Sequence, residues 1–338
     1  MKPSKGDGFM GVGTQIIATG VIGSIGALTL DSILSKGYSL KKENTMRIKR
    51  ILQPNMKSDV PLSYDALNNC EGKEFLIEAI DKLEKAFAGR NLVYFHNNIK
   101  KLKFKTKLSK VDKFFDKSMI GSYNPVKNII QIDPSNTSRA LSHELLHLAS
   151  TTKDFSRVYT GFAQRRNIAY FGYGLNEGYT ELLNNRYFLD KKSTIYYAEQ
   201  LYAQGIEKLV GRQQMEYYYF IGELSYLYQD LKKYYSDEEI QKLIVSLDII
   251  NDYSYNDKRT KRQDRLLKKS FKISYLLIYK GLLKKLEESE YVLHEVNDFY
   301  FLINEIKEIT ELYDVDINED ITPEWSKVYR KILGTKCK

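Results

Sequence analysis

The sequence predicts an α+β protein, in which a first half of short strands and helices precedes a mostly helical second half. Between residues 91 and 132, runs of β-favouring residues alternate with turn residues, as in short strands. Beyond residue 190, apolar residues recur at the three-and-four spacing of amphipathic helices. The chain has 338 residues, of which 43% are apolar, and this is ordinary for a globular protein with a real core.

The N-terminal region contains an uncharged segment. No charged residue occurs from Gly8 to Leu30, a length that fits the about 20 mostly apolar residues of a membrane-spanning helix. We therefore expect residues 1–30 to form a hydrophobic anchor, with membrane association through residues 9–30, and residues 31–60 to form a basic linker. The basic residues of the linker favour a cytoplasmic location for the rest of the chain, but long domains also translocate against such charges.

The first folded elements are expected in a core over residues 61–190. Phe75 to Phe87 has the spacing of an amphipathic helix. A turn is predicted over residues 122–125, where Pro125 follows Asn124. Lysines alternate with apolar residues in one of the expected strands, which is typical of a sheet edge. The predicted strands are residues 91–95, 101–107 and 126–132.

Two helices are predicted in the second part of this core. The first covers residues 135–150, directly after a strand-breaking Asp-Pro pair, and the second covers residues 175–187. The rest of the chain, residues 191–338, is expected to be a helical C-terminal part. Its segments with helical spacing are 206–209, 215–231, 238–250, 266–286 and 299–312.

The helix over residues 135–150 contains the sequence His-Glu-Leu-Leu-His, which has the form HExxH. Residues four apart lie on one helix face, so His143 and His147 can present two imidazoles to a single ion. Glu144 is offset by about 100° and lies beside that ion, where it can act as a general base toward water. The motif therefore predicts a zinc site and metallopeptidase chemistry.

A catalytic zinc site needs a third protein ligand and one open position. Further along the chain, Glu177 and Glu181 lie four residues apart and share one face of a predicted helix. We assign Glu177 to the metal. Glu181 is assigned to the second N–H of a ligand histidine, favouring His143, because such histidines usually donate to a carboxylate or carbonyl. The reversed assignment of the two glutamates is the alternative.

These residues resemble the gluzincin clan of zinc metallopeptidases, the thermolysin-like group. The resemblance consists of His143, Glu144 and His147, followed by Asn176-Glu177 and Glu181, and it covers residues 120–190. In that clan the second helix carries N-E-x-x-x-D, and here a glutamate with one more methylene replaces the aspartate. The resemblance implies a zincin-like catalytic domain with a small edge sheet and one catalytic Zn²⁺.

The resemblance also implies a strand along the substrate cleft and an electrophile for the oxyanion. We expect the strand over residues 126–132 to border the cleft, with Asn128 and Ile130 in its substrate edge, where a peptide would add by main-chain hydrogen bonds. A tyrosine or histidine near the metal would donate to the oxyanion. The candidates are Tyr170, Tyr173 and, more distantly, His294.

The predicted function is zinc-dependent hydrolysis of peptide bonds in a peptide or protein substrate. The alternative is a catalytically inactive zincin-fold binding module at a membrane. A net charge of +9 and the basic run over residues 258–269 would suit nucleic acid, but no nucleic-acid motif accompanies them, so no such partner is expected. With only Cys70 and Cys337, a disulfide framework and a cysteine-zinc site are excluded.

Overall fold

The computed structural model describes most of the chain from residue 73 onward. The predicted anchor and linker, residues 1–60, lie outside the described part. Within the described part, no helix combines the length and the apolar character needed to cross a membrane. The described stretches are residues 73–88, 92–106, 120–133, 137–154, 157–166, 169–190, 192–256, 258–288, 293–317 and 325–327.

Two helices begin the described fold. Helix α4 (Lys73–Ala86) buries Leu76, Ile80 and Leu83 along one face, as its spacing predicts. Helix α5 (Val93–Ile99) replaces the strand predicted over residues 91–95, so that prediction was wrong. The buried residues Leu92, Phe95 and Ile99 follow helical spacing, but a short apolar run does not distinguish a strand from a buried helix.

The first sheet has three strands, and its turn lies later in the chain than predicted. Strand β1 (Lys103–Lys105) lies at one edge, as predicted, and pairs in parallel with β3 (Ile129–Ile132). Strand β2 (Gly121–Asn124) pairs antiparallel with the other side of β3 and forms the second edge. The turn therefore follows Asn124 instead of covering residues 122–125.

The predicted substrate edge at Asn128 and Ile130 is wrong, because β3 is the central strand of this sheet. Ile130 pairs with Phe104 of β1 on one side and with Tyr123 of β2 on the other. Asn128 lies in the turn with a positive φ of 54°, and its buried side chain bonds to Asn98 and Tyr123. The edge nearer the HExxH helix is β2, which packs against that helix.

A second sheet, which the sequence did not predict, follows the HExxH helix. Its four strands form a meander in the order of the chain, with every neighbouring pair antiparallel. Each strand has only three or four residues, and most of these residues are polar. The alternation of apolar and polar residues that indicates a strand is therefore too short to detect. The strands are β4 (Thr151–Asp154), β5 (Arg157–Thr160), β6 (Ala163–Arg166) and β7 (Ala169–Phe171).

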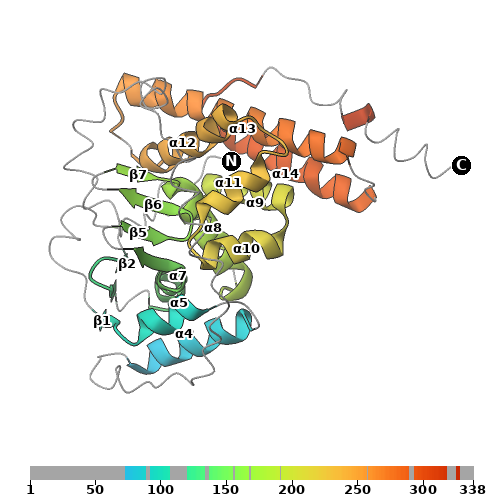
Figure 1. The fold of residues 1–338 in the computed structure, drawn as a ribbon. Helices are drawn as coiled ribbons and strands as arrows, with labels where there is room; N and C mark the ends of the chain where they lie inside the picture. Colours follow the sequence, from blue (N-terminus) through green and yellow to red (C-terminus); the bar gives the residue numbers. More distant parts are fainter. Residues whose placement is uncertain are drawn as a thin grey trace, which may run out of the picture.

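From the HExxH segment onward, helices form where they were predicted, but the segment over residues 215–231 is divided between two helices and that over 206–209 is the end of a longer helix. Helix α7 (Thr137–Ala149) carries HExxH, and α8 (Tyr173–Tyr187) carries the two downstream glutamates. Figure 1 shows the sheets, α4 and α7 in the lower and left parts, with the later helices above. These are α9 (Tyr197–Val210), α10 (Arg212–Phe220), α11 (Leu224–Leu231), α12 (Asp237–Tyr253), α13 (Lys261–Glu288) and α14 (Leu293–Leu312).

Helix α8 is held centrally by its neighbours. It packs against α7, α9 and α12. Its first turn follows Gly172, whose φ of 77° favours glycine, and is capped from α12. Asp248 accepts the backbone N–H of Gly172 at 3.0 Å and that of Gly174 at 2.8 Å. Free N–H groups at the start of a helix are normally bonded by a nearby N-cap side chain, but here Asp248 of α12 takes this role. The bonds to Asp248 also hold in place the helix that carries Glu177.

Candidate metal centre

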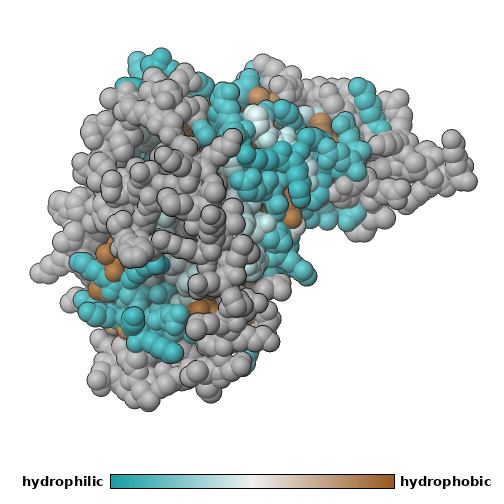
Figure 2. Space-filling model, in the orientation of Figure 1, coloured by the Kyte–Doolittle hydropathy of each residue, from teal (hydrophilic) through white to brown (hydrophobic). Residues whose placement is uncertain are grey.

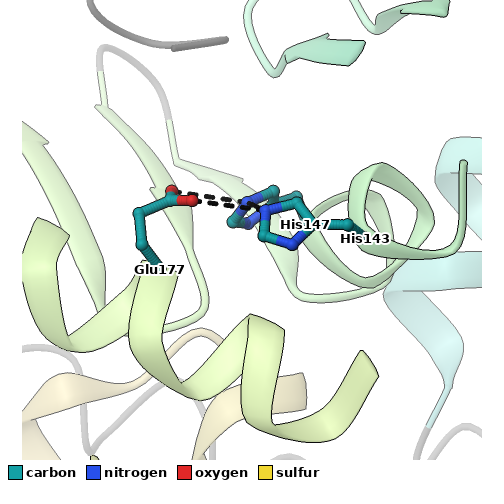
Figure 3. A group of neighbouring side chains, drawn as sticks. All are labelled: His143, His147 and Glu177. Atoms are coloured by element: carbon teal, nitrogen blue, oxygen red, sulfur yellow. Dashed lines mark hydrogen bonds and ion pairs between the residues drawn. The ribbon is translucent and has the colours of Figure 1, made fainter. Parts of the chain in front are cut away.

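Helix α7 separates its apolar side from its imidazoles. Leu141, Leu145 and Leu148 are almost fully buried and anchor the helix in the core. His143 and His147, one turn apart, face helix α8 (Figure 3). The helix packing therefore fixes both rings and points them at one place, as expected for residues four apart.

Glu177 reaches from α8 to both imidazoles and completes a compact triangle (Figure 3). One carboxylate oxygen lies 3.3 Å from Nε2 of His143, and the other lies 3.4 Å from Nε2 of His147. The two Nε2 atoms are 3.0 Å apart. Ligand bonds of 2.0–2.1 Å in a tetrahedral shell place neighbouring ligand atoms about 3.3 Å apart, so these spacings suit one small cation.

The electrostatics of the triangle also favour a cation. Burial opposes a charge on His143, but Glu177 and Glu181 outweigh it and raise the pKa of this imidazole. Burial likewise opposes ionisation of Glu177, yet the charges and hydrogen bonds of His147 and His143 lower the pKa of its carboxyl well below its usual range. Buried carboxylates around two imidazoles therefore stabilise positive charge at this point.

A carboxylate on the outer side orients His143. Nδ1 of His143 lies 2.7 Å from Oε2 of Glu181, which also accepts from the amide of Asn184 at 3.2 Å. Burial opposes ionisation of Glu181, but the hydrogen bond with His143 outweighs it and lowers the pKa of this carboxyl. A carboxylate at Nδ1 places the proton there and leaves Nε2 as the electron-pair donor, as in metal-bound histidines.

His147 is held by a polar group that sequence reasoning left without a role. Its Nδ1 lies 3.2 Å from the side-chain amide of Asn176 and 3.5 Å from the hydroxyl of Thr180. That hydroxyl is also 2.7 Å from the hydroxyl of Tyr219. The Oδ1 of Asn176 accepts the backbone N–H of Phe162 at 3.1 Å, which turns its NH2 group toward His147. Of the two side chains, the hydroxyl of Thr180 is therefore the one that can accept a proton from Nδ1.

The buried group formed by His143, His147 and Glu177 could hold a metal ion. No family model, curated protein or solved structure matches this chain. The capacity for a metal consequently stands on the three side chains themselves, on their donor types and on their spacing.

Glu144 lies beside the triangle without belonging to it. Its carboxylate is buried and accepts the backbone N–H of Tyr123 in β2. Burial raises the pKa of Glu144, and nearby Glu177 adds to this, while both histidines oppose it. A methyl group at Gly121 would lie 3.0 Å from Cβ of Ala140 and 3.4 Å from Cγ of Glu144, so this glycine allows β2 to approach α7 closely.

The two tyrosines predicted as electrophiles lie on consecutive elements of the fold. Tyr170 lies in β7, and Tyr173 is the first residue of α8. The side chains of Tyr170 and His294 are outside what the structure describes. Tyr173 is half-buried and interacts electrostatically with a third tyrosine, Tyr196, that sequence reasoning missed.

Tyr196 covers His143. The two rings are stacked with centroids 6.0 Å apart and planes 23° apart. Burial raises the pKa of Tyr196 well above its usual value, and Glu177 and Glu144 contribute to this. The phenol is therefore a neutral O–H donor at physiological pH, in the electrostatic field of both carboxylates.

The loop before α9 holds Tyr196 in a strained conformation. Its φ of 52° lies in the left-handed region, which is costly for a bulky residue. The neighbouring main chain is tied by Asn185, which donates to the Ser193 carbonyl and accepts the Ser193 N–H, and by Gln200, which donates to Ile195. No sequence pattern reveals such a loop, because its partners come from two different helices.

The effect of burial on a carboxylic acid can be tested at Glu199, which lies near the three metal-facing side chains. Glu199 of α9 is fully buried, accepts from the hydroxyl of Tyr255 at 3.0 Å, and has one oxygen without a hydrogen-bond partner. Burial raises the pKa of Glu199 to about 7. Because the folded value lies above the ordinary value of 4.5, its contribution to stability is complete below about pH 4.5 and is lost as pH rises through about 7.

We expect Glu199→Gln to flatten this pH dependence, because the amide stays neutral. Relative to the parent protein, its free energy of unfolding should rise by up to about 3 kcal/mol at pH 8 and change by less than about 1 kcal/mol at pH 5. Urea unfolding at the two pH values measures this. Glu238→Gln, the same change at an exposed position of α12, is the control. An equal pH dependence in the parent and Glu199→Gln would contradict the prediction.

Proposed function

We propose that this chain is a zinc-dependent metallopeptidase with a zincin-like catalytic domain. The observation that carries the proposal is the triangle of two Nε2 atoms and one carboxylate, with a fourth side chain, Glu144, beside it on the same helix as the histidines. A structural metal site needs no free carboxylate at its side, whereas hydrolysis needs a base there.

Zinc is the metal that suits these donors best. Two imidazole nitrogens and one carboxylate are the ligand set of several hydrolytic zinc sites, which keep a further position open. A zinc ion bound here would act as a Lewis acid on a substrate carbonyl and would lower the pKa of water toward about 7. The carboxylate at Nδ1 of His143 and the polar groups at Nδ1 of His147 would fix both rings for this role.

Each remaining residue has a role that follows from its place. Glu144, whose pKa is raised by burial, would take a proton from the attacking water and deliver it to the leaving amine. Tyr196, with its neutral hydroxyl, would donate to the developing oxyanion. Strand β2 lies at the sheet edge beside Glu144, and a peptide would add to it by main-chain hydrogen bonds.

The proposal is tested with the full chain. Metal mass spectrometry should find about one zinc per chain, and a peptide library should be cleaved. A chelator should abolish cleavage, and added zinc should restore it. Absence of zinc from well-folded protein would overturn the proposal. Anchoring through residues 9–30, and a cytoplasmic catalytic part, belong to the same proposal and are tested by membrane fractionation and protease protection.

The second candidate is an inactive binding module at a membrane, in which the metal is structural. It predicts one zinc per chain without cleavage of any library peptide. Its weak point is Glu144, because a buried carboxylate with a raised pKa next to a metal site costs stability and has no structural purpose there.

Tyr196→Phe separates the proposed oxyanion donor from a packing role. Removing one such donor typically lowers kcat about 10²- to 10³-fold, and the retained ring should keep the stacking on His143 and the bound zinc. Steady-state kinetics on the best library peptide measure the change. Tyr173→Phe is the matched control and should change kcat far less. An unchanged kcat for Tyr196→Phe would show that this ring only packs.

A further inference from the structure

Exposed lysines lie in the turn between β2 and β3, in and just before β1, and in β4. The N–H of Lys103 in β1 donates to the Asn128 carbonyl at 3.0 Å, and the ammonium of Lys153 in β4 donates to the Val126 carbonyl at 3.2 Å. Two different strands are therefore tied to one turn. We call the five exposed lysines the lysine face: Lys101, Lys103, Lys105, Lys127 and Lys153.

The lysine face carries positive charges that no described acidic side chain pairs with. No ion pair between described residues involves a member of the lysine face, whereas half-buried Lys242 pairs with Glu238 and exposed Lys280 pairs with Glu239. Partial burial and the charge of Lys101 lower the pKa of Lys153. The surface thus tolerates repulsion between like charges in the free protein, and a negatively charged partner would relieve it.

An exposed apolar side chain lies within this face. Val126 is 53% exposed and belongs to the turn, next to Lys127. Figure 2 shows hydrophilic residues with a few apolar ones beside them over the lower left of the molecule, where Figure 1 places β1 and β2. A cationic surface with one protruding aliphatic residue fits a lipid headgroup layer, into which the apolar group can insert.

We propose that the lysine face docks this domain onto an anionic lipid membrane, with Val126 entering the headgroup layer. Basic clusters are attracted to anionic leaflets through the headgroup phosphates and carboxylates. The uncharged segment from Gly8 to Leu30 gives the same chain a sequence of membrane-spanning length, so the docking would set the orientation of an anchored domain.

Edge protection and nucleic-acid binding fit these lysines less well. Lysines on an edge strand prevent edge-to-edge pairing, which would account for Lys103 and Lys105 of β1 but not for Lys101, Lys127 and Lys153. Nucleic acid also attracts lysines, but single strands are bound by exposed aromatic residues. The aromatic side chains of this sheet, Phe104 and Tyr123, are buried. A lipid surface therefore fits better.

The test measures vesicle binding of the full chain. Affinity is measured for anionic vesicles, which contain phosphatidylcholine and phosphatidylserine, and for neutral vesicles of phosphatidylcholine alone. The readout is the ratio of the two affinities, because any binding contribution common to both vesicle types cancels in the ratio. Replacing Lys101, Lys103 and Lys127 together by glutamine should lower this ratio about a hundredfold at physiological salt. Val126→Ser should weaken binding to the anionic vesicles several-fold.

The matched control replaces Lys261, Lys269 and Lys272 of α13 by glutamine, which gives the same change in net charge on a helix at the opposite end of the molecule (Figure 1). This control should keep the parent ratio. Circular dichroism and zinc content should match the parent in both variants, since neither touches the metal centre. An equal loss in both triple variants, or no loss in the first, would overturn the proposal. So would retention on duplex DNA or RNA without preference for anionic vesicles.

Discussion

Glu144→Gln is expected to keep the bound metal and to lower turnover about 10²- to 10⁴-fold, the range typical of a lost general base. The amide has nearly the shape of the carboxylate, and its oxygen can still accept the backbone N–H of Tyr123. It cannot take a proton from water. Glu144 is not among the three metal-facing side chains, so zinc content should not change. Single-turnover kinetics and metal mass spectrometry on the same preparation measure both effects.

The control for this variant is Glu238→Gln, which makes the same chemical change on the exposed face of α12. It should hydrolyse the test peptide at the parent rate. If Glu144→Gln also hydrolysed the peptide at that rate with zinc bound, Glu144 would not be the base. The binding-module candidate would then not be favoured either, because hydrolysis would have been observed.

The metal-facing residues could be predicted from sequence because their geometry is local. His143 and His147 share a helix face by spacing alone, and so do Glu177 and Glu181. The sequence could not show how the two helices meet. That depends on packing of α8 between α7, α9 and α12, and on a cap supplied by Asp248 from a distant part of the chain.

The parts that failed are those decided by tertiary context. The apolar run predicted as a strand over residues 91–95 is too short to distinguish a strand from a buried helix, and the helical spacing of Leu92 and Phe95 becomes clear only when Ile99 is included. The strand that contains Ile130 was predicted to bind substrate at its edge, but it is the central strand, and β2 forms the edge. Strand order depends on contacts between residues far apart in the sequence. Tyr196 could not be found, because its position over His143 depends on a strained loop that Asn185 and Gln200 hold in place.

Glu177→Ala is expected to abolish stable metal binding. It removes one of three ligands and the negative charge that faces both Nε2 atoms, and it leaves two imidazoles with an open side. Since changes outside the ligand set already cost about 10- to 100-fold in affinity, loss of a ligand should cost at least about a hundredfold. Zinc content after dialysis, and zinc titration monitored by calorimetry, measure the loss.

Glu181→Ala is the comparison that decides between the two assignments of the glutamates. Glu181 contacts Nδ1 of His143, on the ring side away from the metal position, so its loss should weaken zinc binding only about 10- to 100-fold. If Glu181→Ala lost more zinc than Glu177→Ala, the reversed assignment would be correct. If neither variant changed zinc content, the metal would be bound elsewhere.

Glu177→Ala and Glu181→Ala should also differ in how much added zinc raises their Tm. A ligand that binds only the folded state raises stability by RT ln(1 + [L]/Kd), which is about 2.7 kcal/mol at a zinc concentration of 100 Kd. Added zinc should therefore raise the Tm of the parent, raise that of Glu181→Ala at higher zinc concentrations, and leave that of Glu177→Ala nearly unchanged. An equal zinc-dependent shift in all three proteins would mean that Glu177 takes no part in holding the metal.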